Sequence, residues 1–219
     1  MRSGPRSLRM TAFVLLEILE TGHQQQFEEG AKAVSQIMSI GLIEVSSVAT
    51  GFGVEDTMLK AAAVKLLMAR SICSGKFLIV VSGDVTSVEA ALQAGASAAG
   101  PSLIEKRQIA RVHPSVLEAI SNAVEVDPRQ LRSIGVIETF SAASIVEVAD
   151  AAVKSANVTL LRVHLAMALG GKGFVLMAGD VASVQAAVAA GSKVAAEDGM
   201  LVGRGVIANP SEELFRDYI

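Results

Sequence analysis

One motif occurs twice in this chain, and this repeat constrains the fold more than any other feature. The pentapeptide IGLIE that starts at Ile40 returns as IGVIE at Ile134, 94 positions later. The block SGDVTSV that starts at Ser82 returns as AGDVASV at Ala178, 96 positions later. The second copy therefore carries two extra residues between the blocks, where the copies differ most. A repeat of this kind in 219 residues predicts two similar domains of roughly 90 residues each.

The repeat also sets the expected domain limits. We place the first domain at residues 38–127 and the second at 128–219, with a linker from Val124 to Arg132 that contains Asp127-Pro128. Residues 1–37 have no counterpart in the second copy and form an N-terminal extension that we expect to be flexible. The alternative for this extension is an amphipathic docking helix from Thr11 to Glu20.

Hydrophobic periodicity predicts the same order of elements in both copies: a strand, a helix, two strands joined by a turn, a helix and a last strand. In the first copy these are Ile40 to Val45, Val54 to Ala63, Lys65 to Arg70, Phe77 to Val81, Val85 to Ala98 and Ile104 to Val112. In the second they are Ile134 to Thr139, Ile145 to Ala156, Thr159 to Val163, Gly173 to Met177, Val181 to Ala195 and Met200 to Ile207. Two helices on one face of a four-stranded, mostly antiparallel sheet form a ferredoxin-like arrangement. The expected fold class is α+β, with two such domains in tandem.

Composition favours a self-associating protein and argues against several functional classes. Hydrophobic residues make up 51% of the chain and charged residues only 19%, so part of the apolar surface is expected to lie in contacts between copies. A net charge of −3 and the lack of a basic cluster argue against nucleic-acid binding. No segment approaches the roughly 20 apolar residues of a membrane span. The single cysteine forms no internal disulfide, which is typical of a cytoplasmic protein.

Few residues suggest catalysis. Asp84 and Asp180 each follow a glycine and precede a helical pattern, which predicts two helix N-caps. Glu44 and Glu138 end matching strands, and a solvated or intersubunit face explains them better than acid–base chemistry. Gly-Lys pairs at Lys76 and Lys172 lack the other residues of a phosphate-binding loop. The three histidines show no metal-ligand spacing, and no nucleophilic triad is visible, so we do not expect an enzyme.

Cys73 lies in the loop where the two copies differ, beside Ser74 and Gly75. A lone cysteine is by default a small buried hydrophobic residue. A turn between two strands, however, favours an exposed thiol. If three chains formed a pseudo-sixfold ring from their six domains, three such loops would meet at the axis, and their thiolates would bind a metal or a cluster there.

The repeated motifs resemble those of bacterial microcompartment shell proteins of the tandem-domain, trimer-forming type. Besides the two blocks above, the resemblance rests on the helix ends at Lys60 and Lys154 and covers Met38 to about Arg216. Three further stretches are most similar to the iron–sulfur members of that family, namely residues 71–77, 112–117 and 157–164.

The resemblance implies a role for several residues. Cys73 would ligate one [4Fe–4S] cluster per trimer, and the loops around the pore would be formed by Ser74, Gly75, Leu169, Gly170 and Gly171. Lys60 and Lys154 would pack across the edges between neighbouring tiles. Two departures concern Ser74, where the family has proline, and His113 and Asn209, where shell proteins often have an edge arginine before a proline.

These features together predict a non-enzymatic shell tile. It would be a homotrimer that packs with other shell proteins around enclosed enzymes, with a cluster that transfers electrons across the shell. One alternative keeps the tile but gives it a metabolite-conducting pore without a cluster. The other is a trimeric ferredoxin-like enzyme or signalling protein.

Overall fold

The computed structural model describes residues 39–121, 124, 127, 132–166 and 169–215. The N-terminal extension at residues 1–37, its candidate helix and most of the expected linker lie outside these residues. Both repeats belong to one compact unit, Met38–Ile219.

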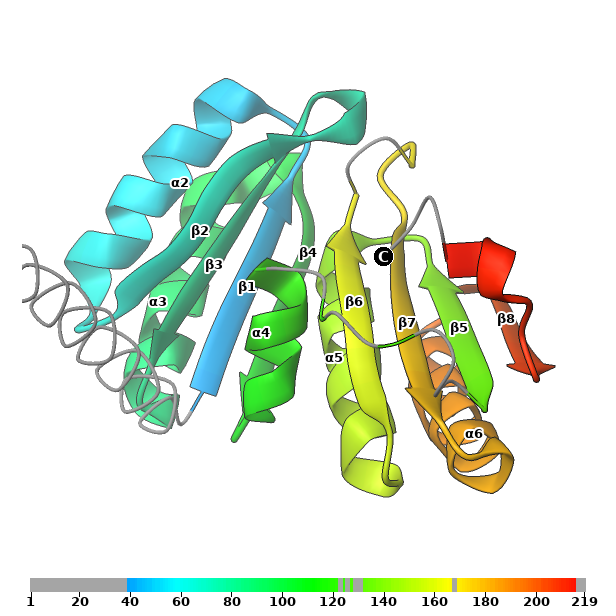
Figure 1. Ribbon diagram of the computed structural model, residues 1–219. Coiled ribbons are helices and arrows are strands. Elements are labelled where there is room, and N and C mark those ends of the chain that lie inside the picture. Colours follow the sequence, from blue (N-terminus) through cyan, green and yellow to red (C-terminus); the bar gives the residue numbers. More distant parts are fainter. Residues whose placement is uncertain (1–38, 122–123, 125–126, 128–131, 167–168, 216–219) are drawn as a thin grey trace, which may run out of the picture. The chain divides into compact units, whose positions relative to one another are not determined.

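Each repeat forms a four-stranded antiparallel sheet with two helices packed on one face (Figure 1). The first consists of β1 (Ser39–Val45), α2 (Val48–Ala61), β2 (Lys65–Ile72), β3 (Lys76–Gly83), α3 (Val85–Ala99) and β4 (Leu103–Ala110). The second consists of β5 (Ser133–Thr139), α5 (Ala142–Ser155), β6 (Thr159–Leu165), β7 (Gly173–Gly179), α6 (Val181–Glu197) and β8 (Leu201–Ala208). The strand orders are β2-β3-β1-β4 and β6-β7-β5-β8. The predicted fold class, two tandem α+β domains, is confirmed.

The glycine of the repeated motif allows the second helix of each repeat to approach the sheet. A Cβ atom on Gly41 would lie 2.8 Å from Val88 of α3, and one on Gly135 would lie 2.6 Å from Val188 of α6. The side chains on either side of Gly41 point to the opposite face because successive residues of a strand alternate. The motif therefore specifies a central strand with close helix packing on one side.

The predicted caps are confirmed. Asp84 accepts a hydrogen bond from the Ser87 backbone N–H (2.8 Å), and Asp180 accepts one from Ser183 (2.9 Å). Hydrogen bonds from the side chain and then the backbone of these serines lower the pKa of both aspartates.

Two helices begin earlier than predicted, and one was not predicted. α2 begins at Val48, where Ser47 accepts a hydrogen bond from Thr50 N–H, and α5 begins after Ser141 in the same way. Glycines in the first turns of α2 hid its start from a periodicity argument. The short helix α4 (Pro114–Ser121) follows β4, with proline at its first position, and packs on β6.

The extra residues of the second repeat lie where two strands turn. The short 3₁₀ turn η1 (Cys73–Gly75) joins β2 to β3, whereas residues 166–172 join β6 to β7. A second difference escaped the sequence comparison: α6 has 17 residues and α3 has 15. Two further 3₁₀ turns are η2 (Gly100–Ser102) and η4 (Glu212–Phe215). Within the described ranges, no helix is long and apolar enough to cross a membrane.

Candidate functional site

Cys73 opens the tight turn η1, and its side chain is partly exposed. The next two residues have left-handed backbone conformations, Ser74 with φ 65° and Gly75 with φ 70°. Proline is restricted to φ near −65°, so this backbone excludes proline at position 74. The proline that the resemblance led us to expect at position 74 would therefore not fit this turn. Both Ser74 and Gly75 are exposed.

The corresponding loop of the second repeat lies beside this turn. Gly170 and Gly171 both have positive φ, and the Lys172 backbone N–H donates to the Leu169 carbonyl (3.3 Å). A Cβ atom on Gly171 would lie only 3.1 Å from Nζ of Lys76, which follows the Cys73 turn. Only glycine tolerates both the conformation and this contact.

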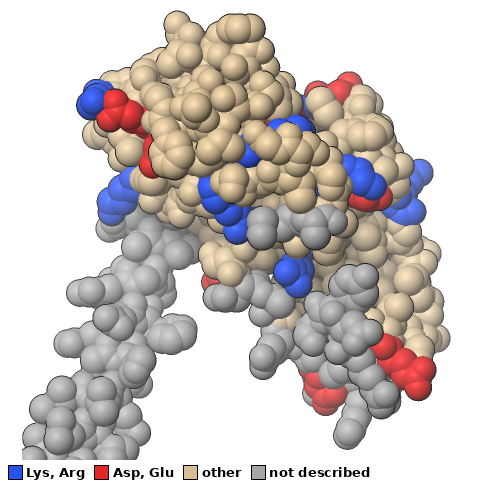
Figure 2. Space-filling model, turned by 90° about the horizontal axis from the view of Figure 1, so that it is seen from above, with Lys and Arg blue, Asp and Glu red and all other residues tan. Residues whose placement is uncertain are grey.

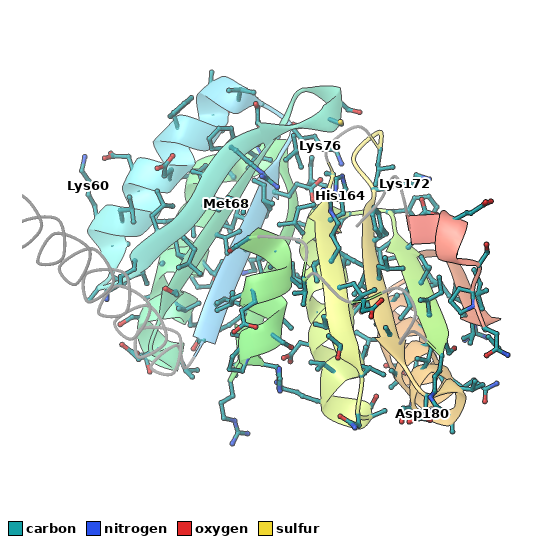
Figure 3. The ribbon with its side chains drawn as sticks, in the orientation of Figure 1. Lys60, Met68, Lys76, His164, Lys172 and Asp180 are labelled. Atoms are coloured by element: carbon teal, nitrogen blue, oxygen red, sulfur yellow. The ribbon has the colours of Figure 1, made fainter. Side chains whose placement is uncertain are left out.

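A lysine–glutamate pair holds the base of each loop. Lys76 Nζ lies 2.7 Å from Glu44 Oε1, and Lys172 Nζ lies 2.5 Å from Glu138 Oε1. Figure 3 places both lysines at the loop end of the sheets, opposite Asp180. These contacts give the two Gly-Lys pairs a structural role in place of phosphate binding.

Glu44 also connects the two repeats. Its side chain is fully buried, and its second oxygen accepts a hydrogen bond from the Ala142 N–H (3.2 Å) at the start of α5. Negative charge at a helix N-terminus is favourable because the first backbone N–H groups have no partner within the helix. Glu138 has 31% of its side chain exposed at the equivalent position.

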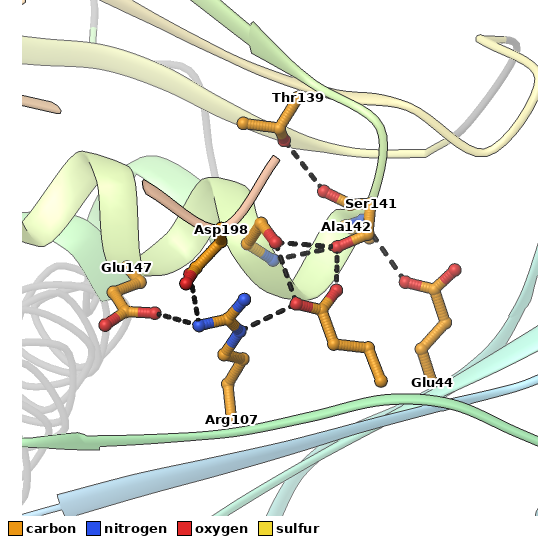
Figure 4. Close-up of polar contacts among 9 residues, drawn as sticks. Glu44, Arg107, Thr139, Ser141, Ala142, Glu147 and Asp198 are labelled. Carbon is orange, nitrogen blue, oxygen red and sulfur yellow. Dashed lines mark hydrogen bonds and ion pairs between the residues drawn. The ribbon is translucent and has the colours of Figure 1, made fainter. Parts of the chain in front are cut away.

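A second network joins the repeats around Arg107 (Figure 4). The guanidinium of Arg107 contacts Glu105 (2.6 Å), Glu147 (3.0 Å) and Asp198 (2.6 Å). Ser144 Oγ donates to Glu105 at 2.8 Å, and Ser141 Oγ donates to its other oxygen.

The charges of this network are shifted by burial and by one another. Burial by itself would lower the pKa of the Arg107 guanidinium. Its hydrogen bond and attraction to Glu105, together with Asp198 and Glu147, outweigh burial and raise that pKa. Burial raises the pKa of Glu147, and Arg107 offsets part of that rise. Sequence reasoning missed this network. Its only signal was that Glu105 and Arg107 have glycines as counterparts in the second repeat.

The residues predicted to lie at a tile edge have different surroundings in the structure. Lys60 pairs with Asp56 (2.6 Å) in solvent on the outer helix α2, as Figure 3 shows for Lys60. Lys154 pairs with Asp150 (2.5 Å), which is buried and also accepts the His113 backbone N–H (2.7 Å). The structure therefore brings His113 and Lys154 together.

Asn209 corresponds to Arg111 and not to His113. Ser39 pairs with Ala110 in the first sheet, and Ser133 pairs with Ala208 in the second, so the residues that follow these strands match. Both have positive φ, 51° for Arg111 and 49° for Asn209. Arg111 therefore occupies in the first repeat the position that Asn209, which precedes Pro210, occupies in the second.

The described residues contain no complete metal site. Among the described residues, no three His, Cys, Asp or Glu side chains come together, and Cys73 is the only cysteine of the chain. A single thiol fits a cluster only if several copies contribute one each.

Viewed from the loop end, most of the described surface is uncharged (Figure 2). The uncharged surface agrees with the apolar composition.

Comparisons with known proteins agree with this geometry. The BMC domain family matches the chain twice, at residues 39–112 and 133–210. The bacterial microcompartment shell protein PduT of Citrobacter freundii is 45% identical over 83% of this chain and 97% of that protein. A carboxysome assembly protein, CcmO of Synechocystis, is 32% identical over 80% of this chain and 63% of its own length. The crystal structure of a microcompartment protein from Desulfitobacterium hafniense superposes with a TM-score of 0.74 at 45% identity, covering 81% of this chain and 98% of that one.

Proposed function

The chain belongs to the bacterial microcompartment shell proteins with two BMC domains, and from this we propose that it is a structural tile that closes into a homotrimer. The trimer would be a ring of six BMC domains that packs with other shell proteins around enclosed enzymes. The observation that carries the proposal is the junction between the two repeats. The corresponding faces at the two outer ends of the repeat pair stay partly exposed and have no such partner among the described residues.

The contrast between the first helices of the two repeats supports the trimer. Val146 on α5 is fully buried at the junction, whereas its counterpart on α2, Phe52, is 63% exposed. Nine residues of α5 are buried but only three of α2. Phe52 is exposed on a helix face that is buried in the corresponding helix of the second repeat. Such an exposed apolar side chain is typical of a surface that another copy of the chain covers.

The sheets show such contrasts in both directions. Ile109 on β4 is 5% exposed, whereas its counterpart Ile207 on β8 is 44% exposed. Leu161 on β6, where α4 packs, is fully buried, and its counterpart Leu67 on β2 is 43% exposed. Each repeat thus exposes a face whose counterpart is buried at the internal junction. The exposed face of the first repeat in one chain and that of the second repeat in another chain would cover each other. Head-to-tail contacts of this type close into a ring when the rotation between units permits.

The residues at the internal junction differ chemically from their counterparts at the outer faces of the two repeats. The four charged residues that meet at the internal junction all correspond to glycines at the outer faces: Glu105 to Gly203, Arg107 to Gly205, Glu147 to Gly53 and Asp198 to Gly100.

The outer faces also differ from the internal junction in where their side-chain volume lies. A Cβ atom on Gly53, Gly100 or Gly205 would meet nothing within 4 Å. Phe52 replaces the smaller Val146 on the facing helix. The volume lost from the strand edge is therefore regained on the helix, which favours an apolar contact between chains.

The trimer would bring three Cys73 thiols to its axis, and we propose that they hold a [4Fe–4S] cluster. A cluster bound there would supply one-electron transfer across the shell. This chain's own residues would position the thiols. The turn at Ser74 and Gly75 sets the direction of Cys73, and the Lys76–Glu44 pair fixes the base of the loop against the second repeat.

Two measurements on anaerobically purified protein test the proposal. Native mass spectrometry should give the mass of three 22.7 kDa chains, and analysis should give about four iron and four sulfide per trimer. Cys73→Ala should remain trimeric without iron, and Ser74→Ala serves as the matched control that keeps iron. A trimer without iron after anaerobic reconstitution would refute the cluster and leave a tile with a small-molecule pore. A monomer would refute the ring.

Tiling needs its own test. Lys60 is solvent-exposed, while Lys154 is held by the buried Asp150, so the two lysines would contribute differently to a tile edge. Electron microscopy of concentrated protein should show extended sheets that are lost on combined Lys60→Ala and Lys154→Ala substitution. Lys193→Ala, on the exposed side of α6, is the matched control. Trimers that never form sheets, alone or with other shell proteins, would count against a tile.

A further inference from the structure

The helix α4 shows how the segment that follows the first sheet covers the second. It follows β4 and packs on β6, an edge strand of the second sheet (Figure 1). Val116 of α4 and Leu161 of β6 are both fully buried. Val124, which follows α4, donates its backbone N–H to the Leu161 carbonyl (2.8 Å). The edge strand of the second sheet is therefore covered by chain that belongs to the first repeat.

The turn η4 is the counterpart of the start of α4. Ala110 and Ala208 occupy equivalent positions at the ends of the two sheets, because they pair with the equivalent first residues of β1 and β5. Four residues later, α4 begins at Pro114 and η4 begins at Glu212. The chain thus turns into a helical segment at the same point after both sheets.

The two helical segments also begin with equivalent caps. In α4 the Ser115 backbone N–H donates to Nδ1 of His113 (3.3 Å), and in η4 the Glu213 backbone N–H donates to Oγ of Ser211 (3.4 Å). In both cases the side chain that accepts lies two residues before the N–H group that donates. The match extends from the strand ends to individual hydrogen bonds, so the residues that follow can be compared one by one.

Both surfaces of the α4–β6 contact have exposed counterparts at the outer ends of the repeat pair. Leu214 of η4, which corresponds to the buried Val116, is 45% exposed. Leu67 of β2, which corresponds to the buried Leu161, is 43% exposed, and β2 is an edge strand like β6. Leu214 lines a hollow of its own sheet together with Ile207, which is 44% exposed. One neighbouring chain would cover both of these side chains.

We propose that the segment from Ser211 to Phe215 of one chain packs on β2 of the next chain, as α4 packs on β6 within a chain. This inference rests on the proposed trimer and identifies the segment that covers the first sheet at each junction between chains. Leu214 would lie against Leu67 of the next chain, so that two exposed apolar side chains cover each other. The contact would also cover the β2 edge, which an exposed sheet otherwise offers to any other strand.

Cross-linking of paired cysteines tests this contact directly. In a Cys73→Ala chain, Leu67→Cys together with Leu214→Cys should allow a bismaleimide to link the chains into a covalent trimer on a denaturing gel. Either of the two new cysteines alone should give single chains. Leu67→Cys combined with Lys193→Cys, on the exposed side of α6, is the matched control and should also give single chains.

Native mass spectrometry of the same samples separates this inference from the proposed ring. A trimer in which Leu67→Cys and Leu214→Cys do not link the chains would overturn the inference and leave the ring in place. A monomer of the parent Cys73→Ala chain would refute the ring and the inference with it.

A dilution series measures how much the segment contributes. Leu214→Ala should raise the protein concentration at which half the chains are in trimers by about tenfold, because part of a buried leucine is lost at each of three junctions. Val181→Ala is the matched control, since Val181 is 37% exposed and its counterpart Val85 is 41% exposed, so neither lies at a junction. Sedimentation velocity gives both values, and assembly of Leu214→Ala equal to that of wild type would overturn the inference.

Discussion

Replacement of Phe52 by alanine tests the proposed contact between chains. Phe52 is 63% exposed in one chain, and its counterpart at the internal junction is fully buried. A phenylalanine side chain offers about 200 Å², so covering the exposed part removes about 120 Å² from water. At about 25 cal/mol per Å², each junction between chains gains about 3 kcal/mol from this residue.

A trimer contains three such junctions, so Phe52→Ala should weaken assembly by about 9 kcal/mol. The dissociation constant of a trimer into three chains then rises by more than 10⁶-fold, at about 1.4 kcal/mol for each factor of ten. The concentration at half assembly follows the square root of that constant and should rise by about a thousandfold. Within the folded chain, the substitution removes the contact between the Phe52 and Phe77 rings, whose centroids are 5.1 Å apart, and should lower stability by only about 0.5–1.5 kcal/mol.

Sedimentation velocity across a dilution series measures that concentration. Phe140→Ala is the matched control, because Phe140 is 57% exposed but its counterpart, Ser46, is also exposed. The control should leave the half-assembly concentration unchanged. An equal shift of the half-assembly concentration for both variants, or no shift for Phe52→Ala, contradicts this prediction. Either result would show that the contact between chains does not copy the internal junction between the repeats.

Three further predictions concern the fold. Arg107→Met should destabilise the chain by about 3 kcal/mol, a fall in Tm of about 6–12 °C, because it leaves the buried Glu105 carboxylate without its ion pair, while the exposed Lys106→Met should stay within about 0.5 kcal/mol in the same thermal unfolding experiment. Gly51→Ala should lower stability to urea by about 1–3 kcal/mol, because the new Cβ would lie 2.4 Å from the Phe77 ring, and unchanged stability would contradict this packing. The lowered pKa of Asp180 stabilises the fold above the aspartate's ordinary pKa, and this stability is lost as pH falls through the folded value. Ser183→Ala should therefore be less stable than wild type at pH 7, and the difference should shrink below about pH 4 in pH-dependent denaturation.

Much of the fold follows from local patterns. The alternation around Gly41 and Gly135 predicts central strands, and Asp84 and Asp180 predict helix starts, because strand alternation and N-capping depend on neighbouring residues alone. The start of α2 escaped prediction because its glycines disfavour a helix locally, and packing of Gly51 against Phe77 outweighs that preference.

The site was only partly predictable. The repeat predicted two domains and a divergent turn at Cys73, and the resemblance of the repeated motifs predicted a shell protein, because motifs and their spacing can be read from the order of residues alone. Tertiary structure alone paired Glu44 with the start of α5 and gathered three carboxylates around Arg107. These contacts join residues far apart in the chain. Their energies depend on burial and on distance in space, which the order of residues does not specify.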